Sequence, residues 1–152
     1  EYKNLYCLLK KGRKVFVAGA GRSGFIGRCF AMRLRHLGIE SYVVGETICP
    51  PVQKRDILLV ISCAGDKRTI LELVKIARKK QATVICITSK KTNLLSKLCN
   101  DSIIIPSEKS VQFGNSLFEQ VTFIFLETFI EYYREREKVA TAEMSKRHTN
   151  LE

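Results

Sequence analysis

The stretch Lys14–Gly24, KVFVAGAGRSG, constrains the fold more than any other part of this sequence. Residues 15–18 form an apolar run with β-branched valines, which is typical of a strand buried in a parallel sheet. Gly19, Gly21 and Gly24 then interrupt the run, and a helical pattern follows. A strand, a glycine turn and a helix start leave unpaired backbone N–H groups, which bind anions. We therefore expect an anion-binding turn here.

Apolar runs alternate with segments of helical periodicity along the rest of the chain. This alternation is typical of βαβ units, in which helices cover both faces of a parallel sheet. We expect one α/β domain over residues 1–152, a three-layer α/β/α sandwich with a five-stranded parallel sheet. The expected strands are 14–19, 41–44, 57–62, 83–88 and 102–105, and the expected helices are 1–12, 22–37, 67–80, 92–99, 117–134 and 139–150.

The expected helix 117–134 is apolar on nearly all sides, with Phe118, Phe123, Ile124 and Phe129 among its residues. A helix of this kind must be buried. In a domain of 152 residues, part of that burial is expected to come from another subunit. The sequence therefore predicts a homo-oligomer.

The formal net charge of +11 suits a nucleic acid or a small anion as partner. The basic residues are spread out, mostly at helix ends and connections, which favours the small anion over nucleic acid. No apolar run approaches the roughly 20 residues needed to span a bilayer. Residues 1–14 lack the apolar core of a signal peptide. We expect neither nucleic acid nor a membrane as partner.

The six cysteines contain no C-x-x-C pair, and the two histidines, His36 and His148, lie far apart in the sequence. Neither pattern is typical of a metal site, so no metal is expected. Free thiols favour a reducing, cytoplasmic compartment. His36 falls within a helical apolar pattern and is expected to pack in the core.

A second polar turn follows the expected strand 57–62. Because parallel strands end at the same edge of a sheet, the two turns are expected to form one two-sided cradle for a phosphate. Thr69 would equally suit a solvated first turn of the next helix. The predicted phosphate-binding residues are Arg22, Ser23, Ser62, Cys63, Ala64, Gly65, Asp66, Lys67 and Thr69.

Residues 19–24 also match G-x-G-x-x-G, and Glu46 follows about 22 residues later, as in a dinucleotide fingerprint. This alternative stays open, as does a tight turn without a ligand. Arg22 and Ser23 in the turn, together with the second polar turn, favour a phosphate group over a dinucleotide.

Five stretches carry a resemblance to a known family: GAGRSG at 19–24, GRCFAMRLRHLG at 27–38, VGET at 44–47, NSLFEQ at 115–120 and RHTNLE at 147–152. With these motifs the sequence resembles the sugar isomerase (SIS) domain and, within it, the 6-phospho-3-hexuloisomerases, from about residue 5 onward. The resemblance implies a flavodoxin-like SIS domain. It also implies a cytoplasmic enzyme of the ribulose monophosphate pathway, with a tetramer as the favoured assembly.

The resemblance further implies interconversion of D-arabino-3-hexulose 6-phosphate and D-fructose 6-phosphate through a cis-enediol, without a cofactor. Glu119 matches the family's catalytic glutamate and would act as the base. His148 would act as the acid or open the sugar ring, because an imidazole titrates near neutral pH. Each residue also has a non-catalytic interpretation. Glu119 would stabilise the first turn of its helix through the helix dipole, and His148 would be a solvated residue near the C-terminus.

The second turn departs from the family's usual S-G-S-G-x-T, because Cys63, Ala64 and Lys67 replace Gly, Ser and Thr. Two hydroxyl groups that would bind phosphate are lost, and Lys67 offsets the loss with its charge. The departure keeps open a non-catalytic sugar-phosphate-binding module, and Cys63 is expected to be a reactive thiol.

Overall fold

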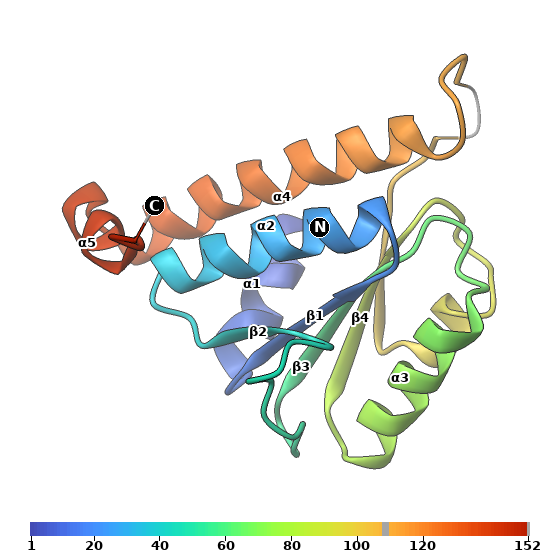
Figure 1. Ribbon diagram of the computed structural model, residues 1–152, viewed down its shortest axis with the longest axis horizontal. Coiled ribbons are helices and arrows are strands. Elements are labelled where there is room, and N and C mark those ends of the chain that lie inside the picture. The colour runs from blue at the N-terminus through green and yellow to red at the C-terminus, as the bar shows by residue number, and fades with distance from the viewer. Residues whose placement is uncertain (108–109, 152) are drawn as a thin grey trace.

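Five parallel strands form one sheet in the order β2-β1-β3-β4-β5 in the computed structural model, which describes residues 1–107 and 110–151 (Figure 1). This order is the flavodoxin-like one and confirms the expected fold. Residues 108–109 of the expected polar loop and residue 152 of the C-terminal motif lie outside the described residues. The strands are β1 (Val15–Gly19), β2 (Ser41–Val43), β3 (Ile57–Ile61), β4 (Thr83–Thr88) and β5 (Asp101–Ile104).

Helices cover both faces of the sheet, as Figure 1 shows. Val15 and Val17 of β1 point into one apolar cluster, and Phe16 and Ala18 point into another, because successive strand residues face opposite sides. The first cluster is covered by α1 (Tyr2–Lys11), α2 (Arg22–His36), α4 (Ser116–Glu137) and α5 (Thr141–Arg147), and the second by α3 (Arg68–Lys79) and the 3₁₀ turn η1 (Ser96–Leu98).

Two expected helices are shorter than the sequence predicts. The expected helix 92–99 is only the turn η1, because the Asn93 side chain accepts the Ser96 N–H at 2.8 Å and competes with helical hydrogen bonds. The expected helix 139–150 is the shorter α5, and its end is extended at His148. There the Thr149 hydroxyl accepts the N–H of Leu151 at 3.2 Å, which is again a local alternative to the helix.

Helices α2 and α4 run side by side in the same direction (Figure 1). Arg22 at the start of α2 pairs with Glu119 in the first turns of α4, and Arg33 near the end of α2 pairs with Glu127 further along. Both helices therefore begin at the carboxyl edge of the sheet, where β1 and β3 also end. The first turns of the two helices face the same space.

Part of α4 is exposed in the single chain, and the apolar pattern predicts that another subunit supplies part of the burial of this helix. Its buried residues include Phe118 and Phe129, whereas Ile124 is 64% exposed. Helix α2 adds Phe25, which is 67% exposed, on the same side of the molecule. We call the exposed apolar residues of the two helices the α2–α4 apolar face: they are Phe25, Met32, Val121, Phe123 and Ile124. Within the described residues, no helix is long and apolar enough to cross a membrane.

Candidate active site

The turns after β1 and β3 meet in a cleft of about 210 Å³ at the carboxyl edge of the sheet. This volume is below the roughly 300–1,000 Å³ of pockets for drug-sized ligands, so the cleft suits a small polar molecule. It lies between β1 and β3, where the order of the strands reverses and such sheets bind their ligands. The lining residues are Ala20, Gly21, Arg22, Ser23, Ile61, Ser62, Cys63, Ala64, Lys67, Asn115 and Glu119.

The first turn brings its backbone close to the start of α2. A Cβ atom at Gly24 would lie 2.7 Å from the carbonyl oxygen of Gly19, so only glycine fits at position 24. Ser23, the second residue of α2, is 8% exposed and lines the cleft. Its hydroxyl has no hydrogen-bond partner among the described residues. The turn therefore offers a free hydroxyl beside the helix N-terminus.

The second turn is fixed by hydrogen bonds from the end of β4. The Cys63 carbonyl oxygen accepts hydrogen bonds from the Thr88 hydroxyl at 2.8 Å and from the Ser89 hydroxyl at 2.9 Å. Ser62 is 5% exposed and lines the cleft, and its hydroxyl is without a partner in the described part of the chain. Among the described residues, only Thr122 has a side-chain oxygen that is fully buried and unpartnered, so the Ser62 hydroxyl is open to the cleft. A ligand in the cleft can accept its hydrogen bond.

Glu119 closes the cleft on the side of α4. Its carboxylate forms an ion pair with Arg22, whose Nε lies 2.6 Å from Oε2, and its side chain is 12% exposed, against 64% for Arg22. The carboxylate thus stands at the wall of the cleft, on the first turns of a rigid helix. A carboxylate in this position can remove a proton from a carbon atom of a bound ligand.

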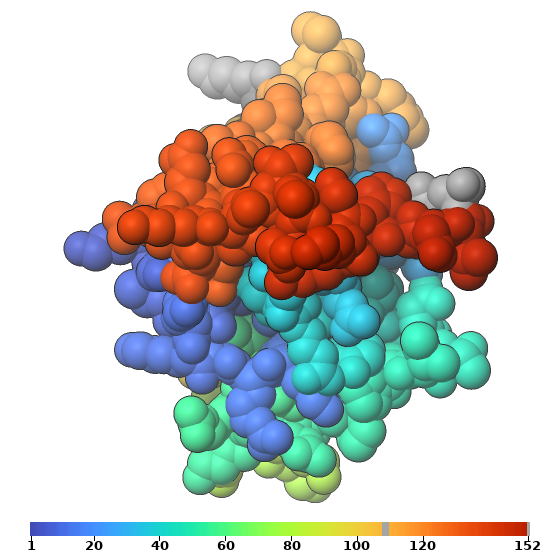
Figure 2. Space-filling model, turned by 90° about the vertical axis from the view of Figure 1, so that its left-hand side faces the viewer, coloured from blue at the N-terminus to red at the C-terminus, as the bar shows by residue number. Residues whose placement is uncertain are grey.

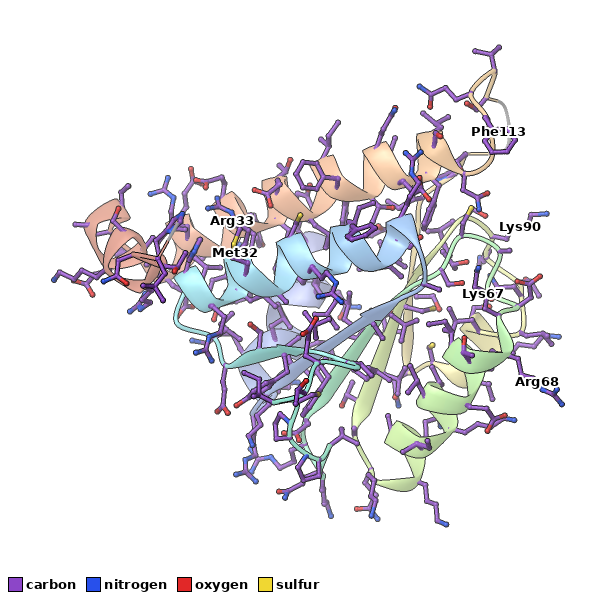
Figure 3. The ribbon with its side chains drawn as sticks, in the orientation of Figure 1. Met32, Arg33, Lys67, Arg68, Lys90 and Phe113 are labelled. Atoms are coloured by element: carbon purple, nitrogen blue, oxygen red, sulfur yellow. The ribbon has the colours of Figure 1, made fainter. Side chains whose placement is uncertain are left out.

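Lys67 adds a positive charge at the opposite rim. It lines the cleft and forms no ion pair within the described residues. Figure 3 shows Lys67 and Lys90 at the end of the molecule where α2 and α4 begin, whereas Met32 lies further along α2. Arg22, Lys67 and the N-terminus of α2 therefore lie at the cleft, and these groups favour an anion.

The cleft brings together most of the residues predicted to bind phosphate. Arg22, Ser23, Ser62, Lys67 and the turn residues 63–64 line it. Three further candidates do not line the cleft. Gly65 is buried against Asn93, and Asp66 and Thr69 are exposed outside the lining residues. Their predicted roles are therefore not supported by contact with the cleft.

His148 lies at the other end of α2. Its ring stacks on that of His36, with ring centroids 5.0 Å apart, and His36 is buried in the core as expected. The 15 residues of α2 span about 22 Å, so His148 and Glu119 of one chain do not meet. Figure 2 shows the red C-terminal residues against the cyan residues at the end of α2.

Asn115 is a cleft residue that the sequence reasoning missed. It precedes α4, and its side chain makes no capping hydrogen bond, although asparagine often caps helices. Its amide is therefore available to a ligand. Its position immediately before a helix that carries Glu119 four residues later is the signal that could have identified it.

Glu46, which the dinucleotide alternative requires, is not part of the cleft. Its carboxylate pairs with Arg28 on the surface of α2. Within the described residues, no group of three or more His, Cys, Asp or Glu side chains could hold a metal ion.

The fold and the cleft define a sugar isomerase domain. The family model of the SIS domain matches residues 8–130, most of the chain. The protein belongs to the SIS domain family.

Curated relatives and a solved structure narrow the similarity further. The chain is 39% identical to the 3-hexulose-6-phosphate isomerase of Methanocaldococcus jannaschii, over 99% of this chain and 86% of the relative. It is 36% identical to that of Mycobacterium gastri, over 95% of this chain and 76% of the relative. The crystal structure of a hypothetical protein from Methanococcus jannaschii, inferred to be a 3-hexulose-6-phosphate isomerase, superposes with a TM-score of 0.95 at 36% identity, over 99% and 85% of the two chains.

Proposed function

We propose that this protein interconverts D-arabino-3-hexulose 6-phosphate and D-fructose 6-phosphate. The observation that carries the proposal is the cleft lined by the Glu119 carboxylate and by the hydroxyls of Ser23 and Ser62, which have no hydrogen-bond partner among the described residues. The names of the curated relatives support the choice of substrate.

The phosphate would lie between the two turns. Ser23 and Ser62 would donate hydroxyl hydrogen bonds, and Lys67 would supply charge. The first turn of α2 would add backbone N–H groups. A dianionic group in this position accepts hydrogen bonds from both hydroxyls and is stabilised by the positive charge of Lys67.

The proton transfer would be carried out by Glu119. From fructose 6-phosphate the carboxylate takes the C3 proton, the C2 carbonyl becomes an enediol hydroxyl, and a cis-enediol joins C2 and C3. Return of the proton to C2 and loss of the C3 hydroxyl proton give the 3-ketose. The atoms and electrons balance within the substrate, so no cofactor is required.

The acid would come from a second copy of this chain. Within one chain His148 is remote from Glu119, and the α2–α4 apolar face next to the cleft is exposed. Apolar residues gathered in this way are typical of protein interfaces. In the proposed homo-oligomer, a tetramer by family resemblance, another copy covers this face and His148 of the partner subunit assists Glu119.

All six cysteines are free. Free thiols persist in a reducing compartment, so we assign the reaction to the cytoplasm and, by the relatives' names, to the ribulose monophosphate pathway.

The test uses the purified full chain with fructose 6-phosphate in D₂O, followed by NMR. The expected results are the 3-ketose and deuterium at C3 of recovered fructose 6-phosphate. Glu119→Gln is expected to reduce both rates about 10²–10⁴-fold. The matched control is Glu127→Gln on the same helix, which removes a surface ion pair with Arg33 and should leave the rates unchanged.

A non-catalytic sugar-phosphate sensor is the second candidate, and the substitutions Cys63, Ala64 and Lys67 in the second turn favour it. A sensor would show a sugar-phosphate-dependent rise in melting temperature without any turnover or deuterium exchange. That result would exclude the isomerase.

The shared site has its own test. Glu119→Gln and His148→Gln chains are each expected to be nearly inactive, and mixed oligomers formed by joint refolding are expected to regain activity. Recovery requires that the two residues come from different chains. If the mixture stays as inactive as its components, His148 acts within its own subunit or not at all.

A further inference from the structure

The ion pair between Arg22 and Glu119 separates two hollows of the surface. One is the phosphate cleft, and the other is a shallow, mainly apolar hollow of about 300 Å³ between α2 and α4, lined also by Phe25 and Phe123. Arg22 and Glu119 line both hollows. A sugar whose phosphate lies in the cleft and whose carbon chain extends toward the apolar hollow must therefore pass this ion pair.

The ion pair occupies the carboxylate that the reaction needs. Arg22 Nε lies 2.6 Å from Oε2 of Glu119, so the two charged groups are in direct contact. The Arg22 guanidinium group then occupies the place beside Oε2 of Glu119 that the substrate carbon would have to take. Catalysis by Glu119 therefore requires that Arg22 move.

The two partners differ in their freedom to move. The Glu119 side chain is 12% exposed and fixed on the first turns of α4, whereas that of Arg22 is 64% exposed. The guanidinium group can rotate away without disturbing the core, and Glu119 would then remain in position. A phosphate group is the stronger attractor, because it carries about −1.5 to −2 charge, whereas a carboxylate carries a single negative charge.

We propose that Arg22 exchanges partners when the sugar phosphate binds. It pairs with Glu119 before binding, then donates to the incoming phosphate and frees Oε2 of Glu119 for the C3 proton. This inference rests on the proposed function. Arg22 is then a positioning residue, and the phosphate group prepares the base as well as anchoring the sugar.

The exchange is tested with inorganic phosphate by calorimetric titration of four full-length proteins: the unmodified chain, Arg22→Met, Glu119→Gln and the double variant. Because Glu119 and phosphate compete for one guanidinium group, Glu119→Gln is expected to tighten phosphate binding about tenfold. Arg22→Met is expected to weaken it by a similar factor. In the Arg22→Met background, Glu119→Gln should have little effect.

The double variant decides between competition and simple repulsion. If Glu119 only repelled the phosphate, Glu119→Gln would tighten phosphate binding in the Arg22→Met background at least as much as in the unmodified chain. That result would overturn the exchange. Arg28→Met is the matched control, because it removes a guanidinium group of α2 that pairs with Glu46 outside the cleft. Its phosphate affinity should equal that of the unmodified chain.

Steady-state kinetics give a second readout. The exchange predicts that Arg22→Met raises KM about tenfold, while kcat stays within a few-fold of that of the unmodified chain. The KM of Arg22→Lys should lie between those of Arg22→Met and the unmodified chain. A loss of kcat at unchanged KM would overturn it, since Arg22 would then only hold Glu119 in place. The phosphate titrations do not depend on turnover. If the protein were inactive but showed the expected phosphate affinities, the exchange would be supported and only the isomerase activity would be excluded. Absence of phosphate binding would overturn both.

Discussion

A Cβ atom at Gly65 would lie 2.5 Å from the side-chain oxygen of Asn93. That side chain is fixed, because its amide donates to the Thr88 hydroxyl at 2.8 Å and its oxygen accepts the Ser96 N–H at 2.8 Å. The Thr88 hydroxyl donates in turn to the Cys63 carbonyl. Asn93 thus supports the turn after β3 from the side opposite the cleft.

Gly65→Ala is therefore expected to destabilise the protein and to weaken phosphate binding. Gly65 has φ +70°, a conformation that costs other residues about 1–2 kcal/mol. The contact with Asn93 should add roughly 1–3 kcal/mol. Thermal unfolding and phosphate titration measure both effects.

The matched control for this prediction is Gly45→Ala. Gly45 has φ +96°, and its added Cβ would meet no atom within 4 Å, so this variant bears the backbone strain alone. If both variants lost the same stability and the same phosphate affinity, the contact between position 65 and Asn93 would be unimportant.

The charge of Lys67 is expected to carry part of the phosphate affinity. Lys67→Met should weaken phosphate binding roughly tenfold at low salt and make the affinity less dependent on ionic strength, because exposed charges are screened. Titrations at two salt concentrations measure this. Lys75→Met on α3, the helix that follows Lys67, is the control, since Lys75 pairs with Glu72 and lies outside the cleft. An equal effect of both variants would point to net charge alone.

The sheet and the two turns could be predicted from the sequence because their signals are local. An apolar run that ends in glycine, as at Gly19, fixes both a buried strand and the turn after it. Register and strand order then bring Ser23 and Ser62 to one edge of the sheet. The same reasoning located Lys67, which lies in the turn between β3 and α3.

The contacts between distant segments could not be predicted in this way. The support of Gly65 by Asn93 joins residues 28 positions apart through side-chain packing, which leaves no periodic pattern. The end of the last helix depends on the Thr149 hydroxyl, so the position of His148 beside His36 was also not foreseen. The pairing of Arg22 with Glu119 connects two helix starts that only the tertiary fold brings together.

Alkylation provides a test of the cleft that is independent of catalysis. Cys63 lines the cleft, so phosphate is expected to slow its labelling by iodoacetamide several-fold. Exposed Cys7 is the internal control, and its labelling should not change. Cys99 is expected to stay unlabelled at neutral pH, because its hydrogen bond with Cys86 and its burial raise the pKa of its thiol. If the rate of Cys63 labelling were the same with and without phosphate, the ligand would bind elsewhere.

The attachment of α1 to α4 is expected to depend on pH through Glu137. Its carboxylate accepts hydrogen bonds from Lys10 Nζ at 2.7 Å and from the Tyr6 hydroxyl at 2.5 Å. These bonds, that from Lys10 first, hold the pKa of Glu137 below its ordinary value of 4.5. A carboxyl group with a lowered pKa stabilises the fold fully above the ordinary value, and that contribution fades as the pH falls through the folded-state pKa.

Glu137→Gln should therefore reduce the free energy of unfolding by about 1 kcal/mol at pH 7, the scale of one such hydrogen-bonded pair. The difference from the unmodified protein should shrink as the pH falls below 4.5 and the carboxylate becomes protonated. Urea unfolding at several pH values measures it, with Glu135→Gln, on the same turn of α4 but outside this network, as the control. A difference that stayed constant down to strongly acidic pH would show that the charge of Glu137 does not hold α1 against α4.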